Sequence, residues 1–313
     1  MLNIGIIGIG HIAQKVYLPY MRQLQGICWH LSTRNASIRQ EVSESFGQAE
    51  VYNSVNDLAE VDLDGVFIHA ATSVHAEIAS LFLKKGIPVY MDKPVTESFA
   101  STFELYQLAQ KHQTFLMTGF NRRFAPRVKE LSTVSNARTI RVEKNDINRP
   151  GPLTAKLFDF FIHPLDTALF LSKEPLIRGH FDYHQEDGLL SHVRVFLVTE
   201  STSLSVSMNL QSGSRREVME IQTPEVTYEL ENLDSLYLYR GNQQEQVSFG
   251  SWDTTLYKRG FETIIDAFLE AVKNGVNPVN PTSSLLSHWI CEQINSSQQP
   301  YGELTFDWFE PKE

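Results

Sequence analysis

The chain has 313 residues, 42% of them hydrophobic, which is enough for two ordinary domains with buried cores. Its formal net charge of −10 argues against a nucleic-acid-binding surface, and no apolar run approaches the ~20 residues of a membrane span. Its two cysteines, Cys28 and Cys291, suit a reducing cytosol and exclude a disulfide framework, so we expect a cytoplasmic protein that binds neither nucleic acid nor membrane.

The first stretch of the chain is an apolar run that ends in a glycine turn. Ile4–Ile7 reads as a buried parallel strand, and Gly8-x-Gly10-x-x-Ala13 follows the G-x-G-x-x-G/A pattern of a dinucleotide-binding turn. Gly8 permits the tight turn, Gly10 lets the backbone approach a pyrophosphate, and Ala13 lets the next helix pack closely on the strand. The alternative is a glycine-rich turn without a ligand, but the strand before it and the helix after it favour a cofactor site.

A helix is predicted over Ile12–Leu24, directly after the turn. Its free N–H groups and the positive end of its dipole are aimed at the phosphates of the ligand. His11 and Ile12 stand at the start of this helix, so we expect them to contact the cofactor through their position rather than through their chemistry.

Strand-like and helical patterns alternate as far as about residue 120, which indicates a doubly wound, parallel α/β sheet. The predicted strands are Asn3–Gly8, Ile27–Ser32, Val51–Tyr52, Gly65–Ala70, Pro88–Met91 and Thr114–Gly119. The further predicted helices are Ala36–Phe46, Val74–Lys85 and Ser98–His112. Residues 1–120 are therefore predicted to form a dinucleotide-binding Rossmann domain.

The end of the second strand decides which dinucleotide is expected. An acidic residue there would accept a hydrogen bond from the 2′-hydroxyl of NAD, but the chain has no Asp or Glu before Glu41. The strand ends instead in Ser32-Thr33-Arg34, which offers two hydroxyls and a guanidinium to a 2′-phosphate. We therefore favour NADP(H) over NAD(H); a solvated loop cation is the other interpretation of Arg34.

Two later stretches leave strand ends where a bound nicotinamide would lie. Ala70–His75 follows the fourth strand, and Asp92-Lys93-Pro94 follows the fifth. Pro94 biases Lys93 toward an extended backbone, where its ammonium can hold a substrate hydroxyl and stabilise the alkoxide. A surface lysine is the alternative interpretation.

After Gly119 the pattern changes to a predicted α+β domain, residues 121–313, with a large, open, mainly antiparallel sheet. Its predicted strands are Thr139–Ile147, Ile177–Gln185, His192–Thr199, Ser203–Leu210, Arg216–Gln222, Thr227–Glu231, Leu236–Tyr239 and Glu245–Phe249. Its main predicted helices are Ala155–Leu171, Tyr257–Lys273 and Pro281–Asn295. Several strands alternate polar and apolar residues, so one face of the sheet is expected to be open or to serve another contact.

The helix over residues 155–171 carries Asp159, His163 and Asp166, which its spacing places on one face. A carboxylate beside an imidazole can act as an acid–base pair, since histidine titrates near working pH and a carboxylate can fix its tautomer. A helix-surface ion pair is the commoner outcome of such spacing. Pro164 in mid-helix is unusual, because it removes a hydrogen bond and kinks the helix unless a new helix starts there.

Two further clusters carry weaker signals. The basic stretch Asn121-Arg122-Arg123 follows the last strand of the first domain, so it either lines the cofactor cleft or solvates the start of a helix. His180, Asp182 and His184 share one strand face, but such a set without cysteine partners is usually solvated, and we predict no metal site.

These residues together resemble the Gfo/Idh/MocA family of NAD(P)-dependent oxidoreductases over nearly the whole chain. The motifs that carry the resemblance are Gly8–Ala13, Ala70–His75, Asp92-Lys93-Pro94 in place of the family's Glu-Lys-Pro, and the pair Asp159 and His163. The family's glycine pair ahead of the last motif is reduced to Gly151-Pro152. Within the family the chain is most similar to the MviM oxidoreductases, through Ile12–Lys15, Gly119–Pro126, Ser212–Glu217 and Trp252–Phe261.

The resemblance implies roles for these residues. Lys93 would orient the substrate and stabilise the alkoxide, His163 would take or give the hydroxyl proton, and Asp159 would position the substrate or the imidazole. The residues expected to bind the cofactor are Gly8, Gly10, His11, Ile12, Thr33, Arg34, Ala71, Thr72, His75, Asp92, Lys93 and Asn121. Family members often form homo-oligomers through the open sheet of the second domain, which the alternating strands of this chain allow.

The leading hypothesis is an NADP(H)-dependent dehydrogenase or reductase that transfers a hydride between nicotinamide and a hydroxyl or carbonyl carbon of a sugar, polyol or related small molecule. The second hypothesis is a catalytically silent NAD(P)-binding regulator with the same fold, and the third is a reductase of a non-sugar such as an imine or enone. The presence of Lys93, Asp159 and His163 as a set argues against the regulator. The substrate pocket has no readable sequence code.

Overall fold

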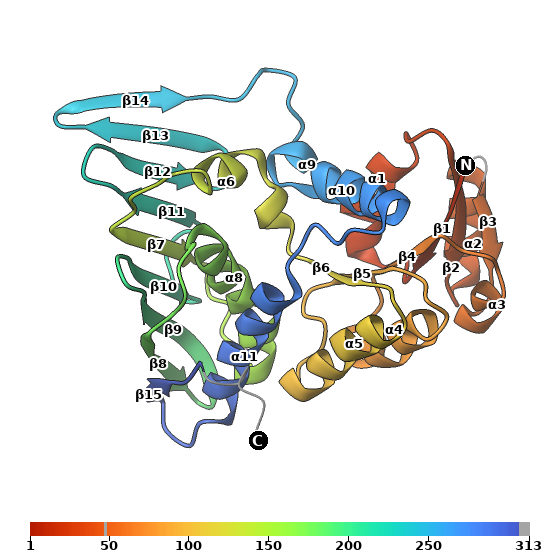
Figure 1. Ribbon diagram of the computed structural model, residues 1–313, viewed down its shortest axis with the longest axis horizontal. Helices are drawn as coiled ribbons and strands as arrows, with labels where there is room; N and C mark the ends of the chain where they lie inside the picture. Colours follow the sequence, from red (N-terminus) through yellow and green to blue (C-terminus); the bar gives the residue numbers. More distant parts are fainter. Residues whose placement is uncertain (47–48, 307–313) are drawn as a thin grey trace. The chain divides into compact units, whose positions relative to one another are not determined.

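The computed structural model describes residues 1–46 and 49–306 and confirms the predicted fold class (Figure 1). Its contacts divide the chain into two compact units. The first comprises Met1–Gly119 and Phe261–Leu285, and the second comprises Phe120–Gly260 and the described residues from Leu286 onward. The segment 121–313, predicted as one domain, thus contributes Phe261–Leu285 to the first unit.

The first unit is built on a six-stranded parallel sheet with the order β3-β2-β1-β4-β5-β6. Its strands are β1 Leu2–Ile7, β2 Ile27–Ser32, β3 Ala49–Tyr52, β4 Gly65–Ile68, β5 Val89–Asp92 and β6 Leu116–Gly119. The strand order reverses at β1, which pairs with β2 on one side and β4 on the other. Doubly wound sheets bind ligands beyond the carboxyl ends of the strands at such a point.

The helices that connect these strands are α2 Ala36–Ser45, α3 Val55–Ala59, α4 His75–Leu83 and α5 Phe99–Lys111. The side chains of Asn35, Ser54 and Ser98 cap α2, α3 and α5 by accepting hydrogen bonds from backbone N–H groups of the first turn. The short helix α3 was not predicted.

The helix after the glycine turn is shorter and wider than predicted. It passes through a π-helical segment, η1 Ala13–Tyr17, into α1 Leu18–Met21, and so ends before Leu24. Pro19 accounts for the wide turn, because it has no N–H to donate and its ring crowds the carbonyl four residues earlier. Tyr17, the last residue of the π segment, is buried.

Helix α10 Phe261–Asn274 packs on the first unit although it comes late in the sequence. The ring of Phe268 makes edge contacts with those of Phe67 and Tyr90. Gly65 permits this close packing, since a Cβ there would lie 2.8 Å from a methyl group of Val272. The prediction had assigned Phe261–Leu285 to the second domain because this segment follows that domain's strands in the sequence, whereas its contacts group it with the first unit.

The helix predicted over Tyr257–Lys273 is broken at Gly260. Helix α9 Thr255–Lys258 ends before this residue, and α10 begins after it. Gly260 has a φ of +77°, and a Cβ there would lie 2.3 Å from the backbone oxygen of Asn121. Glycine meets both demands without strain, so the break reflects a tertiary contact that helical periodicity does not encode.

The second unit holds a nine-stranded sheet with the order β14-β13-β12-β11-β7-β10-β9-β8-β15. Its strands are β7 Thr139–Lys144, β8 Arg178–Glu186, β9 Leu189–Val198, β10 Ser203–Asn209, β11 Glu217–Gln222, β12 Thr227–Glu231, β13 Ser235–Arg240, β14 Gln243–Val247 and β15 Tyr301–Leu304. Neighbours are antiparallel except β7 and β10, which are parallel. Strand β15 was not predicted.

Helices α6 Pro126–Leu131 and α8 Ile162–Leu171 pack on this sheet, α6 against β12 and α8 against β7 and β10 (Figure 1). Helix α11 Pro281–Ser296 adds Ile290, Cys291 and Ile294 to the same apolar core. The alternation seen in β10, where Leu204, Val206 and Met208 are buried and the residues between them are not, matches a sheet covered on one face.

The irregularity predicted at Pro164 takes the form of a second π-helical segment, η4 Lys156–Phe161, directly before α8. The N–H of Ile162 bonds to the carbonyl of Leu157, five residues earlier. Pro164 cannot donate to Phe160, so the preceding turn widens, as it does ahead of Pro19. A short helix, α7 Leu153–Ala155, leads into this segment.

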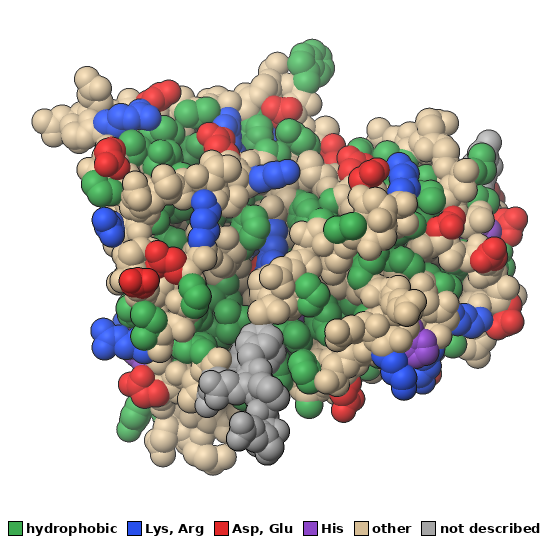
Figure 2. Space-filling model, viewed as in Figure 1, with side chains coloured by type: hydrophobic (Ala, Val, Ile, Leu, Met, Phe, Trp, Pro, Cys, Tyr) green, Lys and Arg blue, Asp and Glu red, His purple; other side chains and the backbone are tan. Residues whose placement is uncertain are grey.

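Acidic and basic side chains are interspersed over the visible face of the molecule (Figure 2). None of the helices in the described part of the chain combines the length and the apolar character that a membrane span requires.

Candidate functional site

The two glycines of the first turn are needed for different reasons. Gly8 has a φ of +85°, and a Cβ there would lie 2.4 Å from the backbone nitrogen of Ala70, so the fold itself demands glycine. Gly10 lies outside the left-handed region, and a Cβ there would meet nothing within 4 Å. No atom of the described residues fills the space beside Gly10, and a dinucleotide turn needs such a space for the pyrophosphate to approach the backbone.

The residues beside this space are accessible. Gly10, His11 and Ile12 are exposed, Ile12 to 54%, whereas Ala13 is buried against the sheet. The N–H of Gln14 bonds to the carbonyl of Gly10 at 3.0 Å, so the helix starts at the turn. The N–H groups ahead of Gln14 belong to the first helical turn, which has no acceptors of its own for them.

At the end of β2, Ser32 is buried, Thr33 is half-buried and Arg34 is exposed. A second arginine lies close by, because Arg39 Nη1 donates to the backbone oxygen of Thr33 at 2.9 Å. This strand end therefore presents two guanidinium groups and a threonine hydroxyl. Arg39 was missed in the sequence because its approach depends on the turn that leads into α2.

The carboxylate of Asp92, at the end of β5, is held by two buried side chains. The hydroxyl of Tyr17 donates to Oδ1 at 2.6 Å, and Nδ1 of His69 lies 2.9 Å from Oδ2. Burial acts to raise the pKa of Asp92, but the His69 charge and hydrogen bond and the Tyr17 hydroxyl lower it below its usual value. Burial and the Asp92 charge raise the pKa of Tyr17, so its hydroxyl stays a donor. The contact predicted between Asp92 and the cofactor stays a prediction.

His75 links two loops of the first unit. It is 1% exposed, its Nδ1 lies 3.1 Å from the carbonyl oxygens of Pro94 and Val95, and its Nε2 lies 2.9 Å from that of Ala70. The ring of His75 thus lies between carbonyl oxygens of the loop after β5 and of the loop after β4. Lys93 is half-buried within this held loop, and its peptide bond to Pro94 is cis.

Ala71 and Thr72, predicted to line the cofactor path, flank the start of the 3₁₀ turn η2 Thr72–Val74 after β4. Ala71 is exposed and Thr72 is half-buried. Both side chains are thus reachable from solvent at the same strand end as the held loop that carries Lys93.

The three polar residues predicted to share one helical face have different environments. Asp159, within η4, is exposed, His163 is half-buried and Asp166 is buried. Asp166 accepts from Arg123 at 2.9 and 2.5 Å and from Ser287 at 2.8 Å. The π segment η4 lies between Asp159 and His163, so the α-helical spacing assumed for this pair does not hold there, whereas His163 and Asp166 both lie in α8. The buried pair of Asp166 with Arg123 is structural.

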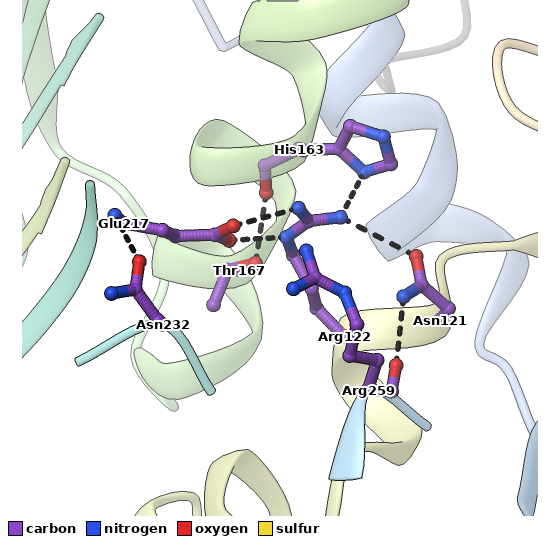
Figure 3. Close-up of polar contacts among 7 residues, drawn as sticks. All are labelled: Asn121, Arg122, His163, Thr167, Glu217, Asn232 and Arg259. Atoms are coloured by element: carbon purple, nitrogen blue, oxygen red, sulfur yellow. Dashed lines mark hydrogen bonds and ion pairs between the residues drawn. The ribbon is translucent and has the colours of Figure 1, made fainter. Parts of the chain in front are cut away.

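Arg122 joins His163 to a buried carboxylate (Figure 3). Its Nε and Nη2 donate to the two oxygens of Glu217, the Nη2 contact being 2.8 Å long, and its Nη1 lies 2.8 Å from His163 Nδ1. Arg122 and Glu217 are 5% and 6% exposed. Burial acts to raise the pKa of Glu217, but the charge and hydrogen bonds of Arg122 lower it to about 2, so the pair is ionised at neutral pH.

The contact with Arg122 orients the ring of His163. Arg122 Nη1 lies 2.8 Å from Nδ1, so this edge of the ring is turned toward the buried ion pair. Nε2 lies on the opposite edge of the ring, where an imidazole can exchange a hydrogen bond or a proton with a substrate oxygen.

Asn121, predicted to contact the cofactor, is buried and uses its amide within the second unit (Figure 3). Its Nδ2 donates to the backbone oxygen of Arg259 at 2.8 Å, and its Oδ1 accepts from Arg122 Nη1 at 3.4 Å. Burial lowers the pKa of Arg259, and the neighbouring Arg122 charge lowers it further. The role of Asn121 toward the cofactor stays a prediction.

The histidines of β8 take part in local pairs. Asp182 accepts from Arg194 at 2.8 and 2.9 Å, and His180 stacks on Phe196. The ring of His184 stacks on a neighbouring histidine of β9. Within residues 1–46 and 49–306, no group of three or more His, Cys, Asp or Glu side chains is arranged to hold a metal ion.

Comparison with known families matches both parts of the chain. Residues 2–120 match the oxidoreductase family with an NAD-binding Rossmann fold, Gfo/Idh/MocA, and residues 126–241 match the YceM-like C-terminal domain. YceM of Salmonella typhimurium, a protein named as an oxidoreductase, is 32% identical over 88% of this chain and 91% of its own. Myo-inositol 2-dehydrogenase of Thermotoga maritima and UDP-N-acetylglucosamine 3-dehydrogenase of Acidithiobacillus ferrooxidans are each 26% identical over 55% of this chain, and the matches span 55% and 54% of their own lengths.

Two solved structures are similar over almost the whole chain. A Gfo/Idh/MocA family oxidoreductase from Vibrio cholerae is 34% identical, with a TM-score of 0.88 over 94% of this chain and 97% of its own. The dehydrogenase MviM from Clostridium difficile is 30% identical, with a TM-score of 0.89 over 94% and 98%.

Proposed function

The chain belongs to the Gfo/Idh/MocA family of oxidoreductases, and we propose that it is an NADP(H)-dependent dehydrogenase or reductase of a sugar, a polyol or a related small molecule. Two features of the first unit support cofactor binding: the open space over Gly10 and the exposed start of the helix that follows. Both are what a dinucleotide pyrophosphate requires.

The end of β2 is the observation that carries the choice of NADP(H). Arg34 is exposed there, Arg39 is held against the backbone of Thr33, and the chain has no acidic residue before Glu41. Two guanidinium groups would meet a 2′-phosphate, whereas the 2′-hydroxyl of NAD would find no carboxylate at the usual position.

The nicotinamide, when bound, supplies or accepts the hydride. The residues of the chain handle the substrate oxygen and its proton. Lys93, on the loop held by His75, orients the substrate and stabilises the negative charge that develops on its oxygen. His163 exchanges the proton with that oxygen. The Glu217–Arg122 pair holds the Nδ1 edge of His163 and so orients the ring, and Asp159 positions the substrate.

The relatives support the substrate class. By their names, one acts on myo-inositol and another on the sugar of UDP-N-acetylglucosamine. Both substrates carry secondary hydroxyls on a six-membered ring, which is the group that a hydride transfer to nicotinamide oxidises. We therefore place the substrate of this chain among cyclic polyols, sugars and sugar derivatives.

A hydride-transfer screen over polyols, sugars and sugar acids, run in both directions with NADP(H) and NAD(H), tests the proposal. Titration calorimetry of both cofactors accompanies it. We expect turnover of at least one compound and a clear preference for NADP(H). Equal affinities for the two cofactors would remove the argument from Arg34 and Arg39. Tight cofactor binding with no turnover on a broad panel would favour a regulator instead.

A further inference from the structure

Three cationic side chains of the second unit converge on the ring of Phe160. Lys156 Nζ lies 4.3 Å from the ring centroid, and Lys144 Nζ and Arg149 Cζ each lie 5.2 Å from it. Lys156 belongs to η4, Lys144 to the end of β7, and Arg149 to the loop after β7. We call these four residues the Phe160 cluster. Three cations thus gather around one ring in a chain whose net charge is −10.

Gly151 provides the room that Lys156 needs. A Cβ at this position would lie 2.5 Å from Cε of Lys156, so the glycine leaves a slot for the lysine stem. The carbonyl of Gly151 accepts from the N–H of Leu190 at 2.8 Å, which fixes the floor of the slot to β9. The ammonium of Lys156 is thus held against Phe160 by packing on both sides.

The nearest carboxylate to Arg149 is shared with a second arginine. Oδ1 of Asp146 accepts from Arg215 at 2.8 Å and from a backbone N–H at 2.9 Å, and its Oδ2 accepts from Arg149 at 3.3 Å. Burial lowers the pKa of Lys156, and the Arg149 charge lowers it further against the weaker opposing effect of Asp159. A bound anion would relieve this repulsion.

The Phe160 cluster adjoins the candidate catalytic residues of the second unit. Phe160 directly follows Asp159 and lies three residues before His163. The charge of Lys144 also contributes to the low pKa of Glu217, the carboxylate that holds the arginine beside His163. The Phe160 cluster and His163 thus lie on neighbouring turns of the segment formed by η4 and α8.

We propose that the Phe160 cluster binds an anionic group of the substrate, a phosphate or a carboxylate, and that the substrate is a phosphorylated or acidic sugar rather than a neutral one. This inference rests on the proposed function, because it takes His163 to be the residue that meets the reacting oxygen. Lys156 and Lys144 supply compact positive charges, and Arg149 supplies a planar fork that matches an oxyanion.

Binding of inorganic phosphate, measured by titration calorimetry at low ionic strength without cofactor or substrate, tests the cluster separately from turnover. Lys156→Met keeps the apolar stem over Gly151 and removes the charge. Lys129→Met, at an exposed position of α6, is the matched control. We expect Lys156→Met to weaken phosphate binding by roughly tenfold or more, because one charge-assisted contact is lost. Lys129→Met should leave phosphate binding unchanged. Phosphate binding that is the same in both variants overturns the proposal.

Competition then separates the two chemical classes. A hexose phosphate, a hexuronic acid and the neutral hexose are each tested as competitors of bound phosphate. We expect one of the two acidic sugars to displace the phosphate and the neutral sugar to leave it bound. Equal displacement by the neutral sugar, or none by either acidic sugar, overturns the proposal. Phosphate binding that depends on Lys156, in a protein that turns over nothing on the panel, supports the anion site and contradicts the proposed oxidoreductase function.

Discussion

Replacing Glu217 by glutamine removes the charge that faces the buried guanidinium of Arg122, while keeping the shape of the side chain. The pKa of this carboxyl lies at about 2 instead of 4.5, a shift of about 2.5 units. At 1.36 kcal/mol per unit, this corresponds to roughly 3 kcal/mol of stabilisation. It agrees with the ~3–5 kcal/mol typical of breaking one side of a buried ion pair. We expect Glu217→Gln to lower the free energy of unfolding by about 3 kcal/mol at neutral pH.

Urea-induced unfolding followed by circular dichroism measures this change. Glu220→Gln, on the same strand β11, is the matched control, because Glu220 is half-buried and accepts from the Gln222 amide. That control should cost no more than about 0.5–1 kcal/mol. If Glu217→Gln proved no more destabilising than Glu220→Gln, the Arg122–Glu217 pair would not be the stabilising contact that the geometry indicates.

The pH dependence provides a second check on the same pair. The pKa of Glu217 is lower in the folded protein than in the unfolded chain, so its stabilisation is fully present above pH 4.5 and is lost as the pH falls toward 2. The wild-type protein should therefore lose its advantage over Glu217→Gln across this window. An advantage that stayed constant down to the acid end would contradict the lowered pKa.

Three further predictions concern the first unit. Gly10→Ala should leave the free energy of unfolding within about 0.5 kcal/mol of wild type but weaken NADP(H) binding roughly tenfold or more. Gly8→Ala should instead destabilise the fold by roughly 1–3 kcal/mol. Thermal unfolding measures the stability and titration calorimetry measures the binding. Arg34→Ala should weaken NADP(H) binding about tenfold and leave NAD(H) binding unchanged; an equal effect on both would show that Arg34 does not meet the 2′-phosphate. Tyr17→Phe should cost roughly 1.5–3 kcal/mol in thermal unfolding because the half-buried carboxylate of Asp92 loses one of its two partners, and Tyr20→Phe, whose hydroxyl meets an exposed carboxylate, should cost less.

The first unit was readable from the sequence because its signals are local. An apolar run, a glycine turn and a helix start within the first 13 residues are enough to indicate a dinucleotide-binding strand and turn. The strand ends of β4 and β5 were found for the same reason, since each apolar run stops at polar residues. The structure adds what local pattern cannot give, namely that Asp92 is held by Tyr17 and His69, which lie 75 and 23 residues away in sequence.

The second unit was less readable because its site depends on long-range pairs. Glu217 ends the stretch Ser212–Glu217 that resembles the MviM oxidoreductases, but nothing in that stretch indicates its pairing with Arg122, 95 residues away. The two consecutive arginines after β6 were a signal, but burial decides their meaning: Arg122 reaches His163, whereas Arg123 fills the core beside Asp166. The irregularity at Pro164 was predicted from the proline, whereas the π turn ahead of Pro19 was not.

The central claim is that Lys93 and His163 act on the oxygen of a substrate that exchanges a hydride with the cofactor. Turnover of an active substrate with NADP(H), measured in Lys93→Ala and His163→Ala together with their cofactor affinities, tests it most directly. We predict that each variant loses turnover by about 100-fold or more, and that His163→Ala binds NADP(H) as tightly as wild type. Either variant turning over at the wild-type rate would contradict the account.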